Sequence, residues 1–184
     1  MKPIIYGLLT SVTVVLTACN SQPANKDMAD KDSAGATMPM NNDEEAKEER
    51  NKKTALESAE AINQHDVNVV LKDAAPDVVD YSDGAMPPTK SKDSINVMIS
   101  NWMKAFPDVK GSNLKAVADG DWVVVWGDWN GTWKGDFMGQ KATGKSYKTR
   151  EADIFRFNNE GKIIEHYSAS TWPATAMQTG MKMQ

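Results

Sequence analysis

Cysteine and histidine are scarce in this chain. The 184 residues include one cysteine, Cys19, and two histidines, His65 and His166. A single cysteine excludes a disulfide framework, and these three residues form no cluster with the spacing of zinc ligands. No glycine-rich run joins a strand to a helix in the way that a phosphate-binding loop requires. We therefore expect no metal and no cofactor.

An excess of positive charge is also missing. The chain has 21 lysines and arginines against 25 aspartates and glutamates, a net charge of −4. This balance argues against binding to nucleic acid. An apolar fraction of 40% with six tryptophans is enough for a packed core, so wholesale disorder is excluded. The length fits one domain with additional segments at its ends.

The longest apolar run lies at the N-terminus. Residues 4–16 follow the single cation Lys2 and are too few to form a permanent membrane span, which is the pattern of a secretory signal. The run ends in Leu16-Thr17-Ala18-Cys19, which resembles the lipobox of bacterial lipoproteins. The resemblance implies a signal peptide over residues 1–18, an acylated Cys19 that anchors the chain to a membrane, and a location in the cell envelope. Because Asn20 stands where an aspartate would signal inner-membrane retention, the outer membrane is favoured in a cell that has one.

Two segments have no regular apolar spacing. Residues 19–53 are predicted to form a lipidated flexible tether, and the acidic run at its end could join the first helix of the domain. Residues 173–184 are predicted to form a flexible, methionine-rich tail. Thioethers are soft ligands that suit Cu(I), but flexible segments also gather methionine without binding metal, so copper remains the weaker interpretation.

Residues 54–172 are predicted to form the folded domain. Helical spacing of apolar residues indicates a helix near 55–62, a second after the cap Asp66, and a third after the cap Ser91 that ends before Pro107. Strands are predicted at 77–81, 109–118, 122–133, 148–157 and 163–170. The order of these elements predicts an α+β fold in which a curved antiparallel sheet wraps around two or three N-terminal helices.

Several short motifs, taken in order, resemble a known family. They are Asn63-Gln64-His65-Asp66, Phe106-Pro107-Asp108, the stretch from Gly131 to Gly139, Thr143-Gly144-Lys145, and the stretch from Asp153 to Tyr167. This series is similar to the SnoaL-like (polyketide cyclase-like) domain of the nuclear transport factor 2-like superfamily. The resemblance implies a cone-shaped fold with a pocket for a small molecule, often dimeric through the outer face of the sheet.

A candidate catalytic site follows from the expected hairpin. If residues 158–161 form the turn, Asp153 lies directly opposite His166, and Glu151 lies opposite Ser168. A carboxylate beside an imidazole raises its basicity, so His166 is a candidate general base, with Asp153 orienting it and Glu151 assisting. The alternative is a structural hydrogen-bonded pair across the sheet.

The family's own acids are absent at two positions. Related cyclases carry an aspartate where this chain has Ser168, and related ketosteroid isomerases carry their base at the position that we align with Tyr81. A serine hydroxyl cannot transfer a proton as a carboxylate does without a neighbouring base. The resemblance therefore does not carry over either activity.

Tryptophans lie on both faces of the strand at 122–133. Trp129 and Trp133 share one face, where they are candidate walls of a pocket. The candidate ligand-binding residues are these two tryptophans together with Tyr81, Phe155 and Ser168. The alternative is plain core packing. Trp122 and Trp126 share the opposite face, where they would leave an exposed apolar patch, so we expect a homodimer.

Three functions are compatible with these features. The preferred one is a membrane-tethered lipoprotein that binds a small, partly apolar molecule. The second is an enzyme of the cyclase, isomerase or hydrolase type that uses the His166 and Asp153 dyad. The third is a non-catalytic protein-interaction module.

Overall fold

The computed structural model describes residues 42–169 and 172–183. The predicted signal peptide, the lipobox cysteine Cys19 and the first part of the predicted tether lie outside the described residues. None of the helices within the described ranges is long and apolar enough to cross a membrane.

Helices form the first part of the described chain. They are α1 (Asn42–Ala61), a short 3-10 helix (Ile62–Gln64), α2 (Val67–Val70) and α3 (Lys92–Ala105). The side chain of Asp66 accepts a hydrogen bond from the backbone N–H of Asn68 and caps α2, while the side chain of Ser91 caps α3 in the same way through Ser94. Both caps are the ones that the sequence predicts.

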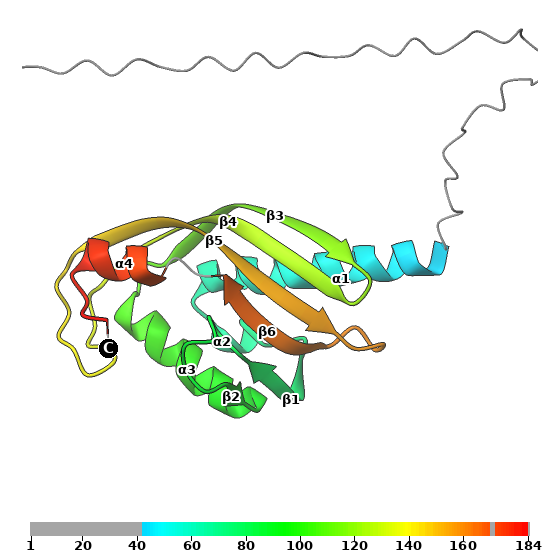
Figure 1. The fold of residues 1–184 in the computed structure, drawn as a ribbon, viewed down its shortest axis with the longest axis horizontal. Helices are drawn as coiled ribbons and strands as arrows, with labels where there is room; N and C mark the ends of the chain where they lie inside the picture. The colour runs from blue at the N-terminus through cyan, green and yellow to red at the C-terminus, as the bar shows by residue number, and fades with distance from the viewer. Residues whose placement is uncertain (1–41, 170–171, 184) are drawn as a thin grey trace, which may run out of the picture. The chain divides into compact units, whose positions relative to one another are not determined.

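Six strands form one sheet in the order β2-β1-β6-β5-β4-β3 (Figure 1). They are β1 (Ala74–Asp80), β2 (Thr89–Lys90), β3 (Lys110–Asp119), β4 (Trp122–Thr132), β5 (Ser146–Phe157) and β6 (Ile163–Ala169). The strands from β3 to β6 pair as an antiparallel meander, but β1 pairs with β6 in parallel. The predicted α+β fold is confirmed. The sheet is mixed instead of antiparallel because α3 and the whole meander separate β1 from β6, and a connection of that length allows parallel pairing.

The first helix begins earlier than the predicted domain boundary. Residues 42–53, expected to belong to the flexible tether, form the first half of α1. Three acidic residues in the first turn complement the helix dipole. Glu48 accepts a hydrogen bond from the backbone N–H of Gly120 (2.7 Å), and Lys47 forms an ion pair with Asp121. This half of α1 is thus held against the turn between β3 and β4.

The predicted flexible tail also contains a helix. Helix α4 (Trp172–Thr179) buries Thr175, Ala176 and Thr179. Gly180, at φ 76°, ends the helix in the left-handed conformation that favours glycine, and the backbone N–H of Met181 donates to the carbonyl of Ala176 (3.0 Å). Met181, only 6% exposed, then joins the core, so burial fixes a segment whose sequence has no helical apolar spacing.

The core lies between the helices and one face of the sheet. Val123, Val125 and Trp129 on β4 are at most 6% exposed, whereas Trp122 on the opposite face is 40% exposed. Residues of α1 and α3, such as Ala55, pack against the buried valines. This alternation confirms the predicted assignment of the strand faces. We call the helix-covered side of the sheet the inner face and the other side the outer face.

Candidate functional site

His166 on β6 lies between two carboxylates on the inner face. Its Nδ1 is 2.8 Å from Oδ2 of Asp80, the last residue of β1, and its Nε2 is 3.3 Å from Oδ1 of Asp153 on β5. The parallel pairing of β1 with β6 places Asp80 directly beside His166. Three neighbouring strands therefore each contribute one side chain to this group.

The two contacts determine the charge of the imidazole ring. An ionised carboxylate can only accept hydrogen bonds, so both ring nitrogens must carry a proton to donate to Asp80 and Asp153. Burial lowers the pKa of His166, but hydrogen bonds to Asp153 and Asp80 and the charges of both carboxylates outweigh it and raise the pKa to about 10. His166 is therefore an imidazolium at neutral pH, and the group of three side chains carries one net negative charge.

Asp80 is the most buried member of this group. Its side chain is 5% exposed, and its Oδ1 accepts hydrogen bonds from the backbone N–H (2.7 Å) and the hydroxyl (2.9 Å) of Ser82. Burial would raise the pKa of Asp80, but the hydrogen bond and charge of His166 and the bonds from Ser82 hold it below its ordinary value of 3.8. Asp80 therefore remains ionised well into the acidic range.

This protonation state changes the role that His166 can take. The sequence predicts a general base, but an imidazolium has no lone pair with which to accept a proton. Asp153 instead keeps an ionised carboxylate whose Oδ1 is held by His166. Any proton acceptor within this group at neutral pH is thus a carboxylate.

The pairing of β5 with β6 differs from the predicted register. Asp153 lies opposite Ser168, and His166 lies opposite Phe155. The register shifts between Arg156 and Phe157, next to the turn. The prediction assumed a regular hairpin and did not include this irregularity. Because the displacement amounts to two residues, the side chains keep their faces, and Asp153 reaches His166 diagonally instead of directly.

The inner face of β5 and β6 carries a strip of polar side chains within an otherwise apolar surface. We call it the inner polar strip; its members are Thr149, Glu151, Asp153, His166 and Ser168. The hydroxyl of Thr149 donates to Oε1 of Glu151 (2.6 Å). The side chains of His166 and Asp153 are 23% and 24% exposed, so solvent reaches the middle of the strip. The structure therefore brings all three predicted catalytic residues to one face.

The predicted ligand-binding aromatics are divided between core and surface. Trp129, Trp133 and Phe155 are on the inner side, but each is at most 6% exposed. Trp129 and Trp133 share a core cluster with Ala176 and Met181 of the C-terminal segment, which matches the alternative of core packing. Within this set, Phe155 comes closest to the polar strip, with its ring 5.1 Å from that of His166.

Tyr81 does not face the inner polar strip as expected. Its ring stacks on that of Tyr167 with centroids 4.7 Å apart, and Tyr167 in turn contacts Trp122 on the outer face. Strand alternation explains this, since the preceding residue, Asp80, points inward. Sequence reasoning chose Tyr81 and missed Asp80, although an aspartate at the end of a short apolar strand was the available signal.

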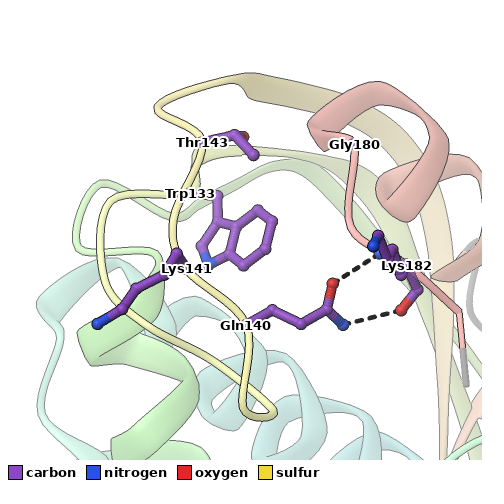
Figure 2. Close-up of a pocket in the computed structure, with 6 residues that line it drawn as sticks. All are labelled: Trp133, Gln140, Lys141, Thr143, Gly180 and Lys182. Atoms are coloured by element: carbon purple, nitrogen blue, oxygen red, sulfur yellow. Dashed lines mark hydrogen bonds between the residues drawn. The ribbon is translucent and has the colours of Figure 1, made fainter.

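Two surface pockets lie away from His166. The first, about 300 Å³, is formed by the loop at 133–145 and the end of the chain, and Trp133 lies at its inner side (Figure 2). The second, about 230 Å³, lies between α1 and α2 and includes Glu57, Ser58 and Val70 in its wall. Within residues 42–169 and 172–183, no group of three histidine, cysteine, aspartate or glutamate side chains could hold a metal ion.

The curved mixed sheet and the covering helices define a cone of the nuclear transport factor 2-like class. The family model of the SnoaL-like polyketide cyclases matches residues 53–171, more than half of the chain. The protein belongs to this family. A search of curated proteins found no match.

Solved structures support the same fold. AclR, a hydroxylase candidate from Streptomyces galilaeus, is 26% identical with a TM-score of 0.62, and the match covers 74% of this chain and 88% of AclR. IdmH, a polyketide cyclase candidate from Streptomyces antibioticus, is 25% identical with a TM-score of 0.56, covering 71% and 98% of the two chains. A SnoaL-like protein from Jannaschia sp. CCS1 has a TM-score of 0.66 at 16% identity, covering 74% and 95%, and shows the fold alone.

Proposed function

We propose that the domain binds a small, partly apolar molecule at the inner polar strip. The observation that carries this proposal is the partial exposure of Asp153 and His166 on a face where the neighbouring Val123, Val125 and Phe155 are buried. Oδ1 of Asp153 is held by His166, which leaves Oδ2 to accept a hydrogen bond from a ligand. Ser168, directly opposite, offers a hydroxyl at the same place.

The charge of the strip favours a ligand with hydrogen-bond donors. Asp80, His166 and Asp153 together carry one negative charge, and Glu151 lies on the same face two residues before Asp153. Carboxylates accept strong hydrogen bonds from hydroxyl or amine groups. The apolar ring of Phe155 next to His166 suits the carbon skeleton of the same ligand. Hydroxylated ring compounds fit this combination.

A matched pair of probes tests the proposal. Dihydroxyanthraquinone supplies hydroxyl donors on a flat ring system, and anthraquinone is the same ring system without them. We expect the full chain to bind the first and not the second, and Asp153→Asn to weaken binding roughly tenfold by removing a charge-assisted hydrogen bond. Asp119→Asn, at the exposed end of β3, is the control and should bind like the parent. Equal binding by both variants, or no binding by the parent, contradicts the proposal.

An enzymatic role is the second candidate. It is favoured by the ionised carboxylate of Asp153, which His166 orients and solvent reaches. In this role Asp153 accepts the proton, and the imidazolium of His166 stabilises negative charge nearby. Proton abstraction from a bound ketone would appear as exchange of its α-hydrogens for deuterium in D₂O, and Asp153→Asn should abolish that exchange.

We also propose that the domain is tethered to the cell envelope through an acylated Cys19 and forms a homodimer. The lipobox and the preceding apolar run support the tether. The outer face supports the dimer, because Trp122 and Val117 are 40% and 53% exposed there and Trp126 lies on the same face. A non-catalytic interaction module would use this same outer face for a different protein.

A further inference from the structure

The first surface pocket is formed by two parts of the chain that are distant in sequence. One is the loop at residues 133–145 between β4 and β5, and the other is the C-terminal segment, residues 172–183; both lie at one end of the domain (Figure 1). The pocket measures about 300 Å³ and is lined by Trp133, Gln140, Lys141, Thr143, Gly180 and Lys182. The family model matches residues 53–171, so the C-terminal wall lies outside the matched range.

Hydrogen bonds fix the two walls of the pocket relative to each other. The side-chain amide of Gln140 donates to the carbonyl of Lys182 (2.8 Å) and accepts from its backbone N–H (2.8 Å), as Figure 2 shows. The hydroxyl of Thr143 donates to the carbonyl of Thr179 (2.6 Å). Burial of Met181 anchors the segment further. A ligand would therefore meet a pocket that is already formed.

This end of the domain is basic, although the whole chain carries a net charge of −4. Residues 133–148 and 172–183 contain one acidic side chain, Asp136, and five lysines, which are Lys134, Lys141, Lys145, Lys148 and Lys182. Lys141 pairs with Asp136, and Lys134 pairs with Asp108. Lys145 and Lys182 form no ion pair with any residue that the structure describes. Lys145 also lies at the pocket, with its Nζ 3.6 Å from where a Cβ on Gly180 would stand.

Exposed methionines lie on the same two segments. Met138 in the loop is 47% exposed, and Met177 and Met183 in the C-terminal segment are 80% and 61% exposed. Met138 precedes Gln140 by two residues, and Met183 directly follows Lys182, so both flank the pocket lining. Thioether side chains form an adaptable apolar surface that accommodates flexible alkyl chains. Positive charge and exposed apolar side chains therefore occur on the same two segments.

From this combination we propose that the pocket binds an anionic amphiphile. Lys145 and Lys182 hold its carboxylate or phosphate head, and its alkyl chain lies across the exposed methionines. The site is separate from the inner polar strip and does not depend on the function proposed for that strip. A free fatty carboxylate and the headgroup of an anionic phospholipid present the same chemistry, and the two arms of the experiment distinguish them.

Calorimetric titration of the full chain with dodecanoate below its micelle concentration tests the free amphiphile. Dodecyl maltoside carries the same alkyl chain without the charge and should not bind. The double variant Lys145→Glu/Lys182→Glu should lose affinity roughly tenfold or more, because two attractive charges become repulsive. The matched control is Lys110→Glu/Lys115→Glu, which makes the same charge change at exposed positions on β3 and should stay within about twofold of the parent.

Co-sedimentation with vesicles tests the headgroup. The site is assigned to a lipid surface if the chain binds phosphatidylglycerol vesicles but not phosphatidylcholine vesicles, and if this binding is lost in the pocket variant and kept in the control. It is assigned to a free amphiphile if the chain binds dodecanoate but no vesicles. If the pocket variant melts earlier than the parent, Lys145→Gln/Lys182→Gln replaces it. The proposal is overturned if neither probe binds, if dodecyl maltoside binds as tightly as dodecanoate, or if both double variants lose affinity equally.

Discussion

Replacing His166 with glutamine separates the effects of its charge from those of its shape. Glutamine is neutral and can donate through one amide group, so it keeps at most one of the two hydrogen bonds that His166 makes to Asp80 and Asp153. Asp80, which is 5% exposed, would then be a buried carboxylate with no cation beside it, held by the bonds from Ser82 and at most one from the glutamine amide. The variant therefore removes the cation that compensates a buried anion.

The cost of His166→Gln can be worked out from this arrangement. Removing one partner of a buried ion pair costs about 3–5 kcal/mol. Because roughly a quarter of the His166 and Asp153 side chains is exposed, water compensates part of the loss, and the glutamine retains one hydrogen bond. We therefore expect the free energy of unfolding to fall by about 2–3 kcal/mol and the Tm by roughly 6–10 °C.

The dependence of this effect on pH follows from the raised pKa of His166. A pKa raised from 6.5 to about 10 means that the folded state binds the proton more tightly than the unfolded state does. The resulting stability is fully present below pH 6.5 and is lost as the pH rises through about 10. At the acid end, the lowered pKa of Asp80 gives stability that is present above 3.8 and is lost as the pH falls through the depressed value.

Urea unfolding of the parent and of His166→Gln, followed by circular dichroism from pH 5 to 10, measures both effects. The difference in the free energy of unfolding between the parent and His166→Gln should be largest from pH 5 to 6.5 and should shrink as the pH approaches 10. The control His65→Asn changes the other histidine, which is exposed, and asparagine tolerates its φ of 55°. A difference below about 0.5 kcal/mol at pH 6, or one that stays unchanged between pH 7 and 10, would refute the assignment of His166 as a buried imidazolium.

Two further predictions concern anchoring and assembly. Cys19→Ser should block lipoprotein processing or release the protein from membranes, which fractionation after a high-salt wash would detect; normal processing and retention would contradict the lipoprotein proposal. Trp126→Glu should convert the proposed dimer to a monomer by burying an unpaired charge on the outer face, as measured by sedimentation; a parent that is monomeric at high concentration would remove the basis for the dimer.

Local patterns predicted much of the fold correctly. The caps Asp66 and Ser91 and the alternation along β4 depend on neighbours within a few residues, and each is present in the structure. The features that the sequence left open or missed depend on distant contacts. The first half of α1 is held by Gly120 and Asp121, and α4 is held by the core around Trp133, so neither has a local apolar pattern that reveals it.

The candidate site shows the same division between local and distant information. Strand parity placed Asp153 and His166 on one face because alternation is a local property. The register was displaced by an irregularity near Phe157, which no residue type announces. Asp80 was missed because its contact with His166 requires the parallel pairing of β1 with β6, a pairing between segments 86 residues apart. The charge of the imidazole could be inferred only once both carboxylates were known.

The serine at position 168 is coherent with this charge arrangement. Ser168 lies directly opposite Asp153, where side chains on neighbouring strands are about 5 Å apart at Cβ. The resemblance to the cyclases implies an aspartate at this position, and here it would place a third carboxylate next to an imidazolium that already serves two. Like charges at that distance disfavour ionisation, so one of the carboxyl groups would tend to bind a proton at neutral pH. With serine, no competing carboxylate stands opposite Asp153. The negative charge facing the strip is therefore supplied by Asp153 on β5 instead of by a residue on β6. The serine at position 168 and the two hydrogen bonds of His166, to Asp80 and Asp153, thus belong to one electrostatic arrangement.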